Sequence, residues 1–93
     1  MGLNSREKFV REIVELIEDN RESWIKAAFY SDPKVEHILE ELYKRWERNS
    51  MQGLPLDYAS QDEIEILRDK ARHYASLSPA EAQRIALQRR MYK

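Results

Sequence analysis

Apolar residues recur every three to four positions along most of the chain, a spacing that is typical of amphipathic α-helices. Four such stretches are separated by short segments rich in Pro, Gly, Ser, Asn or Asp, and no segment alternates in the way that a half-buried strand does. The pattern therefore predicts an all-α protein, with a compact bundle of four helices in a single domain that covers residues 1–93.

The first apolar stretch begins after Asn4 or Ser5, either of which can cap the free N–H groups at a helix start. Its apolar face persists to about Tyr30 across the polar segment EDNRES, which favours one long helix over two short ones. Asn20 falls in the middle of that face, and three interpretations stay open: a buried amide that sets the packing register, a kink, or a partly solvated polar position. The face contains Phe9, Val10, Ile13, Val14, Leu16, Ile17, Trp24, Ala27 and Ala28.

The second stretch, SDPKVEHILEELYKRWERN, carries clear signals at both ends. Ser31 or Asp32 supplies the cap, and Pro33 occupies the first turn, where its missing N–H costs nothing. The helix is expected to end at Asn49 and Ser50. Because only a few residues separate it from the first helix, the two are expected to form an antiparallel hairpin.

The segment SMQGLPLDYASQDE, residues 50–63, is too apolar for a flexible tether, which would be polar and rich in Gly and Ser. Loops of this length are usually either functional or packed by their own side chains. We favour a structural strap across the bundle, followed by a docking strip for another protein and then by a lid. The apolar residues of the segment are Met51, Leu54, Leu56 and Tyr58.

Two further helices follow this segment. Ser60 and Glu63 have the spacing of a capping box and start a third helix that runs to about Ser76. Ser78 and Glu81, with a proline in the first turn, repeat the signal for a fourth. These two shorter helices are expected to pair with each other.

The third and fourth helices are apolar on two opposite flanks, which is typical of helices that are packed on both sides. A bundle of this size can bury one flank of each helix, so the second flank predicts a partner, most simply another copy of the chain. The alternative is that residues 50–63 fold back and cover it. The predicted contact surface consists of Ile66, His73, Leu77, Leu87 and Met91, with Arg84 and Arg90 at its polar rim.

His73 in such an interface would have Asp69 one turn earlier, and that carboxylate would favour the charged imidazolium. Assembly would then depend on pH. The alternative is a histidine at the rim with no special role.

Composition excludes several classes of protein. The chain has sixteen basic and seventeen acidic residues and a net charge of −1, unlike a dedicated nucleic-acid binder. It has no cysteine for a disulfide, a thiol nucleophile or a cysteine metal cage. No apolar run approaches the ~18 residues of a membrane span, and no charged-then-apolar leader opens the chain, so a soluble, cytoplasmic protein is expected.

Candidate chemistry is sparse. The Glu-x-x-His motif of di-metal bundles is missing, because Lys34 and Lys70 stand three residues before His37 and His73. The serines are explained as helix caps or helix ends, and no Gly-rich phosphate loop is present. We therefore expect no catalytic, cofactor-binding or metal-binding residue, no small-molecule substrate, and no enzyme.

The function that these features favour is a non-catalytic interaction, adaptor or regulatory module that binds another protein or self-associates through its third and fourth helices. The alternative is a small DNA-binding regulatory protein that uses its basic C-terminal helix, since residues 84–93 contain four basic residues and no acidic one. Against it, the arginines spread around that helix, and cations in a last turn also stabilise the helix dipole.

Overall fold

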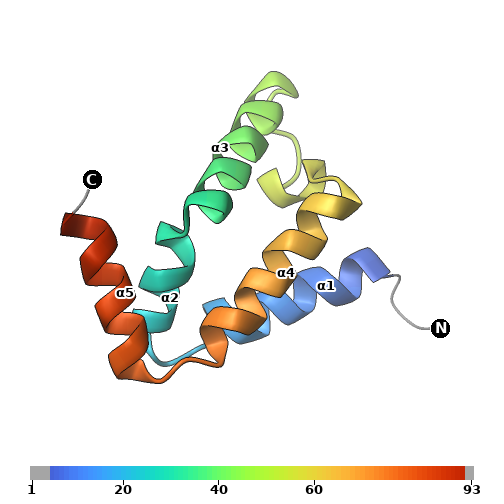
Figure 1. The fold of residues 1–93 in the computed structure, drawn as a ribbon. Helices are drawn as coiled ribbons and strands as arrows, with labels where there is room; N and C mark the ends of the chain where they lie inside the picture. The colour runs from blue at the N-terminus through green and yellow to red at the C-terminus, as the bar shows by residue number, and fades with distance from the viewer. Residues whose placement is uncertain (1–4, 92–93) are drawn as a thin grey trace.

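The computed structural model describes residues 5–91, and over that range the chain is helical with no β-strand. The predicted all-α class is confirmed, but the helix count differs, because five α-helices replace the expected four. Figure 1 shows α1 crossing α4 at one end of the molecule and α5 lying beside α2 at the other. In chain order the elements are α1 (Ser5–Ile13), the π-helical segment η1 (Val14–Glu18), α2 (Ser23–Ser31), α3 (Pro33–Arg48), the 3₁₀ segment η2 (Pro55–Tyr58), α4 (Gln61–Ala75) and α5 (Pro79–Met91).

The prediction of one long first helix is wrong, because the chain leaves the helix at Asn20. The Asn20 side-chain amide donates to the Leu16 carbonyl at 3.0 Å, and its oxygen accepts from the Glu22 backbone N–H at 2.8 Å. Glu22 in turn caps α2 by accepting from the Trp24 N–H at 3.1 Å. Side chains that satisfy backbone groups in this way compete with helix continuation. Of the three interpretations of Asn20, the kink is the nearest, and the alternative cap Asn4 lies outside the described residues.

The predicted hairpin of the first two helices is also wrong. Asp32 is the only residue between α2 and α3, and its extended backbone (φ −61°, ψ 126°) bends the chain without reversing it. An antiparallel helical hairpin needs a loop of about 2–5 residues. The expected pairing of the last two helices is not formed either, because α4 packs on α1 and α5 packs on α2.

The core lies where the first four helices meet, and it contains the aromatic side chains of Phe29 and Tyr74 beside aliphatic ones. Burying a side chain of this size contributes roughly 1.5–3 kcal/mol, so these positions supply much of the stability of a small domain. The largest fully buried side chains are Ile17, Val35, Leu42, Ile64 and Leu67.

Residues 50–63 form a packed strap that is tied to α1. The Arg6 guanidinium donates to the carbonyl oxygens of Leu56, Asp57 and Ala59 at 3.0, 2.9 and 2.6 Å. Three bonds from one side chain fix η2 against the first helix. The strap packs on α3 rather than over α5, so it does not cover the outer flank of the last helix.

The strap is also tied to α3 through Arg45. Its guanidinium binds both carboxylate oxygens of Glu63, at 2.6 and 3.0 Å, and donates to the Tyr58 carbonyl at 3.1 Å. The hydrogen bond from Arg45 lowers the pKa of Glu63 despite partial burial of that carboxylate. Glu63 also accepts from the Ser60 N–H at 2.8 Å, which confirms the predicted capping box.

The turn after α3 places serine where glycine is usual. The Met51 N–H donates to the Trp46 carbonyl and the Ser50 N–H to the Glu47 carbonyl, the bonding pattern of a Schellman motif. Ser50 therefore adopts the left-handed conformation, with φ +59°. Most residues pay about 1–2 kcal/mol for that conformation.

Ser50→Gly is expected to raise the free energy of unfolding by about 0.5–1 kcal/mol. Glycine removes the strain of the left-handed conformation, and the greater conformational entropy of glycine in the unfolded chain offsets only part of that stabilisation. Urea denaturation followed by circular dichroism measures it. The matched control is Gly53→Ala, which should be destabilising. Gly53 has φ +69°, and an added Cβ would lie 2.7 Å from Asp57 Oδ2. A less stable Ser50→Gly protein would contradict the prediction.

Candidate functional site

The residues of the predicted contact surface differ in exposure. Ile66 and Leu77 are half-buried and pack against the core, so this chain uses them in its own fold. His73 is exposed, with its ring edge-to-face on Tyr74 at 5.0 Å. The exposed large apolar side chains of this surface, Leu87 and Met91, both lie on α5. The exposed members on α5 are Arg84, Leu87, Arg90 and Met91.

The expected pairing of His73 with Asp69 is not formed. The Asp69 carboxylate accepts from Arg68 at 2.9 Å, and no hydrogen bond or ion pair within residues 5–91 joins it to His73. Adjacent arginine competes successfully because its charge is permanent. Asp69, the predicted charge partner of His73, therefore pairs with Arg68 instead.

A groove that sequence reasoning missed lies between η1, α2, α3 and the strap. It has a volume of about 260 Å³. Its floor is formed by the buried side chains of Ile13, Phe29, Leu42 and Leu67. Its rim carries four large apolar side chains that are 39 to 67 % exposed: Val14, Tyr30, Tyr43 and Leu54.

The rim residues at the first two helices are placed by the break in the chain. In η1 the Asp19 N–H donates to the Val14 carbonyl at 2.9 Å, five residues back, which is the wide turn of a π-helix. This turn leaves Val14 exposed beside the groove. Tyr30, at the end of α2, donates its hydroxyl to Glu18, which links the two walls.

The other two rim residues are fixed by α3 and the strap. Tyr43 stacks edge-to-face on Trp46, with ring centroids 6.1 Å apart. The Trp46 indole N–H donates to the Gly53 carbonyl at 2.9 Å, and the Leu54 N–H donates to Asp57 Oδ2 at 2.9 Å. Leu54 is thus held at the rim by its backbone while its side chain stays exposed.

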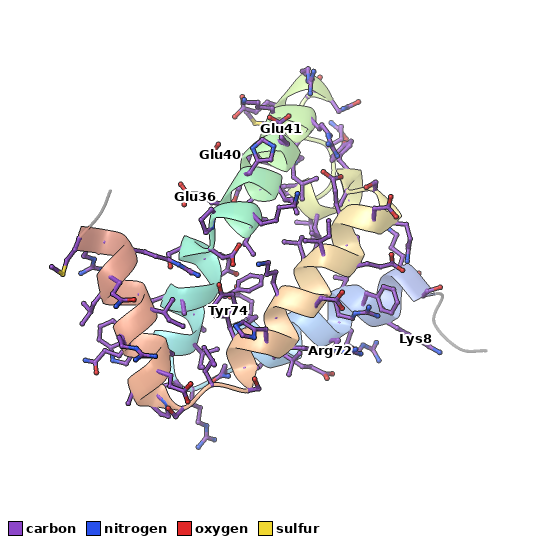
Figure 2. All side chains as sticks on the ribbon, viewed as in Figure 1. Lys8, Glu36, Glu40, Glu41, Arg72 and Tyr74 are labelled. Carbon is purple, nitrogen blue, oxygen red and sulfur yellow. The ribbon has the colours of Figure 1, made fainter. Side chains whose placement is uncertain are left out.

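The charges around the groove are mainly acidic. Glu18 is the single charged residue among those that line it. On α3, Glu36, Glu40 and Glu47 lie seven before, three before and four after Tyr43, which puts them on the same side of the helix. Figure 2 shows Glu36 and Glu40 on the flank of α3 that faces away from α4.

Two of these glutamates keep their charge available. Within the described part of the chain, neither Glu40 nor Glu47 has an ion-pair partner. Lys44, a cationic residue next to Tyr43 on α3, forms an ion pair with Glu41 at 3.5 Å on a different side of the helix. A cationic ligand on this side of α3 would therefore meet carboxylates that have no ion-pair partner within residues 5–91.

A second cluster of polar side chains lies inside the molecule, at the bend between α2 and α3. Asp32 is buried and caps α3 by accepting from the backbone N–H groups of Lys34 and Val35 at 2.8 and 3.1 Å. Its other oxygen accepts from the Tyr74 hydroxyl at 2.5 Å and lies 3.1 Å from Lys70 Nζ. Figure 2 shows Tyr74 between α4 and α2.

These contacts shift the titration of both groups. Burial alone would raise the pKa of Asp32, but the bonds from Tyr74 and the Val35 N–H, together with Lys70, outweigh it and lower the pKa to about 2. Burial raises the pKa of the Tyr74 hydroxyl, and its bond to Asp32 adds to the effect.

Arg89 joins α5 to the same cluster. Its guanidinium donates to the Ala28 carbonyl at 2.6 Å and to the Tyr74 hydroxyl at 2.5 Å. Ala28 lies in the last turn of α2, where carbonyls lack helical partners. Thus one end of the cluster caps α2 and the other caps α3.

Perturbed pKa values often mark functional sites, but here a structural role accounts for each contact. Every buried side-chain nitrogen and oxygen within residues 5–91 has a hydrogen-bond partner. Asp32 itself is buried, with 3 % of its surface exposed. The cluster holds α2, α3, α4 and α5 together, and the apolar groove is the better candidate for a functional site.

Residues 5–91 contain no group of three or more His, Asp or Glu side chains placed to hold a metal ion. None of the helices in that range combines the length and apolar character needed to cross a bilayer. Comparisons with models of protein families, with curated proteins and with solved structures found no match.

Proposed function

We propose that this chain is a non-catalytic protein–protein interaction module whose binding surface is the apolar groove. Seven large apolar side chains are exposed within residues 5–91, and four of them line this one groove. Single exposed apolar residues are normal on a protein surface, whereas their concentration in one place is typical of interaction sites. This concentration is the observation that carries the proposal.

The chemistry of the groove fits a protein segment. Two tyrosines stand at its rim, and tyrosine is a residue favoured in interface hot spots. Small-molecule pockets usually measure about 300–1,000 Å³ and enclose most of their ligand. A groove of about 260 Å³ holds a few inserted side chains instead.

An affinity experiment tests the proposal. The chain is immobilised and exposed to a lysate of its source cells, to which a soluble copy of the same chain has been added. The retained proteins are quantified by mass spectrometry. Tyr43→Ala combined with Leu54→Ala should reduce retention of the specific partners at least tenfold. Met51→Ala removes an apolar side chain that is 59 % exposed but does not line the groove, and it should change nothing. Equal retention by all three proteins would contradict the proposal.

The DNA-binding alternative receives less support from the arrangement of α5. Arg89 is engaged with α2 and Tyr74, and Lys93 lies outside the described residues. Arg84 and Arg90 remain as the exposed cations of the described part of α5. Nucleic-acid affinity grows with the number of phosphates neutralised, and two arginines supply few such contacts.

A further inference from the structure

We infer that the groove is occupied by α5 of a second copy of this chain. The inference rests on the proposed function and names the partner. It joins two unpartnered surfaces of one molecule: the apolar groove with acidic surroundings and the outer face of the last helix.

The outer face of α5 is an amphipathic stripe. Ala80, Arg84, Leu87 and Met91 follow the spacing of one helix face and are all exposed. Met91 is 77 % exposed, the largest value among the large apolar side chains of residues 5–91. A solvated helix face usually carries polar and charged side chains, whereas this stripe combines exposed apolar side chains with a cationic one.

The stripe points away from its own chain. Ala82 and Ala86 are buried on the opposite side of α5, the side that packs on α2. Figure 1 shows α5 at the edge of the molecule, outside α2. The stripe and the groove of one chain therefore face different surroundings, and contact between them requires two copies.

Helix-in-groove recognition uses apolar anchors spaced three, four or seven residues apart. Leu87 and Met91 are four residues apart, which is about 6 Å along the helix axis. They supply two adjacent anchors for a groove that admits a few side chains. Tyr30 and Tyr43 at the rim would pack on either side of them.

The charges of the two surfaces are complementary. Arg84 and Arg90 flank the anchors on α5, and residues 82–91 contain no acidic residue. Glu18 lines the groove, and Glu40 and Glu47, which have no ion-pair partner within residues 5–91, lie beside it on the side of α3 that carries Tyr43. Opposite charges around an apolar contact speed association and set the orientation of the partners.

The contact joins two different surfaces. Two copies can make it reciprocally in a closed dimer, or successive copies can make it head to tail. Both arrangements leave the same signature in mutants, because each contact needs one intact groove and one intact α5.

Light scattering on a sizing column, across micromolar to millimolar protein, tests the inference. We expect the mass of the wild-type chain to rise with concentration. Leu87→Asp on the helix and Tyr43→Asp in the groove should each weaken self-association at least tenfold, with unchanged helicity by circular dichroism. Met51→Asp is the matched control, because Met51 is exposed and lies outside both surfaces.

A mixture of the two deficient variants gives the decisive result. Leu87→Asp retains an intact groove and Tyr43→Asp retains an intact α5, so an equimolar mixture should form a heterodimer at concentrations where neither variant associates with itself. A charge reversal adds a second criterion: Arg84→Glu should weaken association, and Glu40→Arg in the partner copy should restore part of it.

The remaining outcomes overturn the inference in distinguishable ways. A wild-type chain that stays monomeric at every concentration removes the second copy as occupant. Association that survives Tyr43→Asp shows that copies meet through another surface. In both cases the affinity experiment with the groove variants still decides whether the groove binds a different protein, so the proposed function can stand or fall separately.

Discussion

Asp32→Ala is expected to lower the free energy of unfolding by about 3 kcal/mol, a large part of the total for a small domain. The substitution removes the cap of α3, which is worth about 1 kcal/mol. It also leaves Lys70 and the Tyr74 hydroxyl without their carboxylate partner. Removing one member of a buried ion pair costs about 3–5 kcal/mol. The Lys70 side chain is 38 % exposed and regains some hydration, so the lower part of that range applies.

Urea denaturation at neutral pH measures the loss. Asp69→Ala is the matched control, because Asp69 also lies in an ion pair, with Arg68, but its side chain is 65 % exposed. Pairs of that kind contribute about 0–1 kcal/mol. A loss below about 1 kcal/mol for Asp32→Ala would show that water already solvates the cluster.

The difference in free energy of unfolding between the wild-type chain and Asp32→Ala should depend on pH. The pKa of Asp32 is lowered from 3.8 to about 2 in the folded protein. The stabilisation linked to this shift, about 2 kcal/mol, is present above the unfolded value and is lost as the pH falls from about 4 towards 2. The stability advantage of the wild-type chain over Asp32→Ala should therefore shrink by about 2 kcal/mol in that range. Glu12 and Glu63, whose pKa values are also lowered by arginine partners, titrate in both proteins and cancel in the comparison.

Local signals of the sequence predicted the helix starts well. Pro33 follows its cap Asp32, and the capping boxes at Ser60 and Ser78 form with the expected glutamates. These motifs succeed because the groups that bond to one another lie within three residues in the chain. Nothing distant has to be known to recognise them.

Helix ends and helix pairing were harder to predict, because they depend on small free-energy differences between alternative hydrogen bonds and on partners that are distant in the chain. The apolar face of the first stretch continues in phase across Asn20, yet the amide of Asn20 bonds to the backbone and the helix stops. The pairing of α5 with α2 depends on Arg89, whose partner at Ala28 is 61 residues away in the chain. The partners of Arg89 were not visible in the sequence.

The groove could not be predicted from the sequence either, because it too is formed by residues that are distant in the chain. Its rim takes residues from η1, α2, α3 and the strap, and Val14 had been assigned to the buried face of a continuous helix. The π-helical turn changes the register of that face and exposes Val14. Leu54 was the one visible signal, since an apolar residue in a loop needs either a packing partner or a binding role.

Leu42→Ala is expected to lower the free energy of unfolding by about 3 kcal/mol, whereas Tyr43→Ala should cost less than about 1 kcal/mol. Leu42 is fully buried at the floor of the groove, and its loss leaves a cavity that the surrounding helices fill only in part. Tyr43, its neighbour in the chain, is 53 % exposed at the rim. Urea denaturation of the two variants in the same buffer measures both values.

The same two proteins separate stability from binding. Tyr43→Ala should stay folded and still weaken self-association, because the rim side chain contributes mainly to contacts with another molecule. Leu42→Ala should retain partial association at low temperature, where enough of it is folded. Equal stability losses in the two variants would mean that Tyr43 belongs to the core, and the groove would then be a seam between packed helices rather than a surface for a partner.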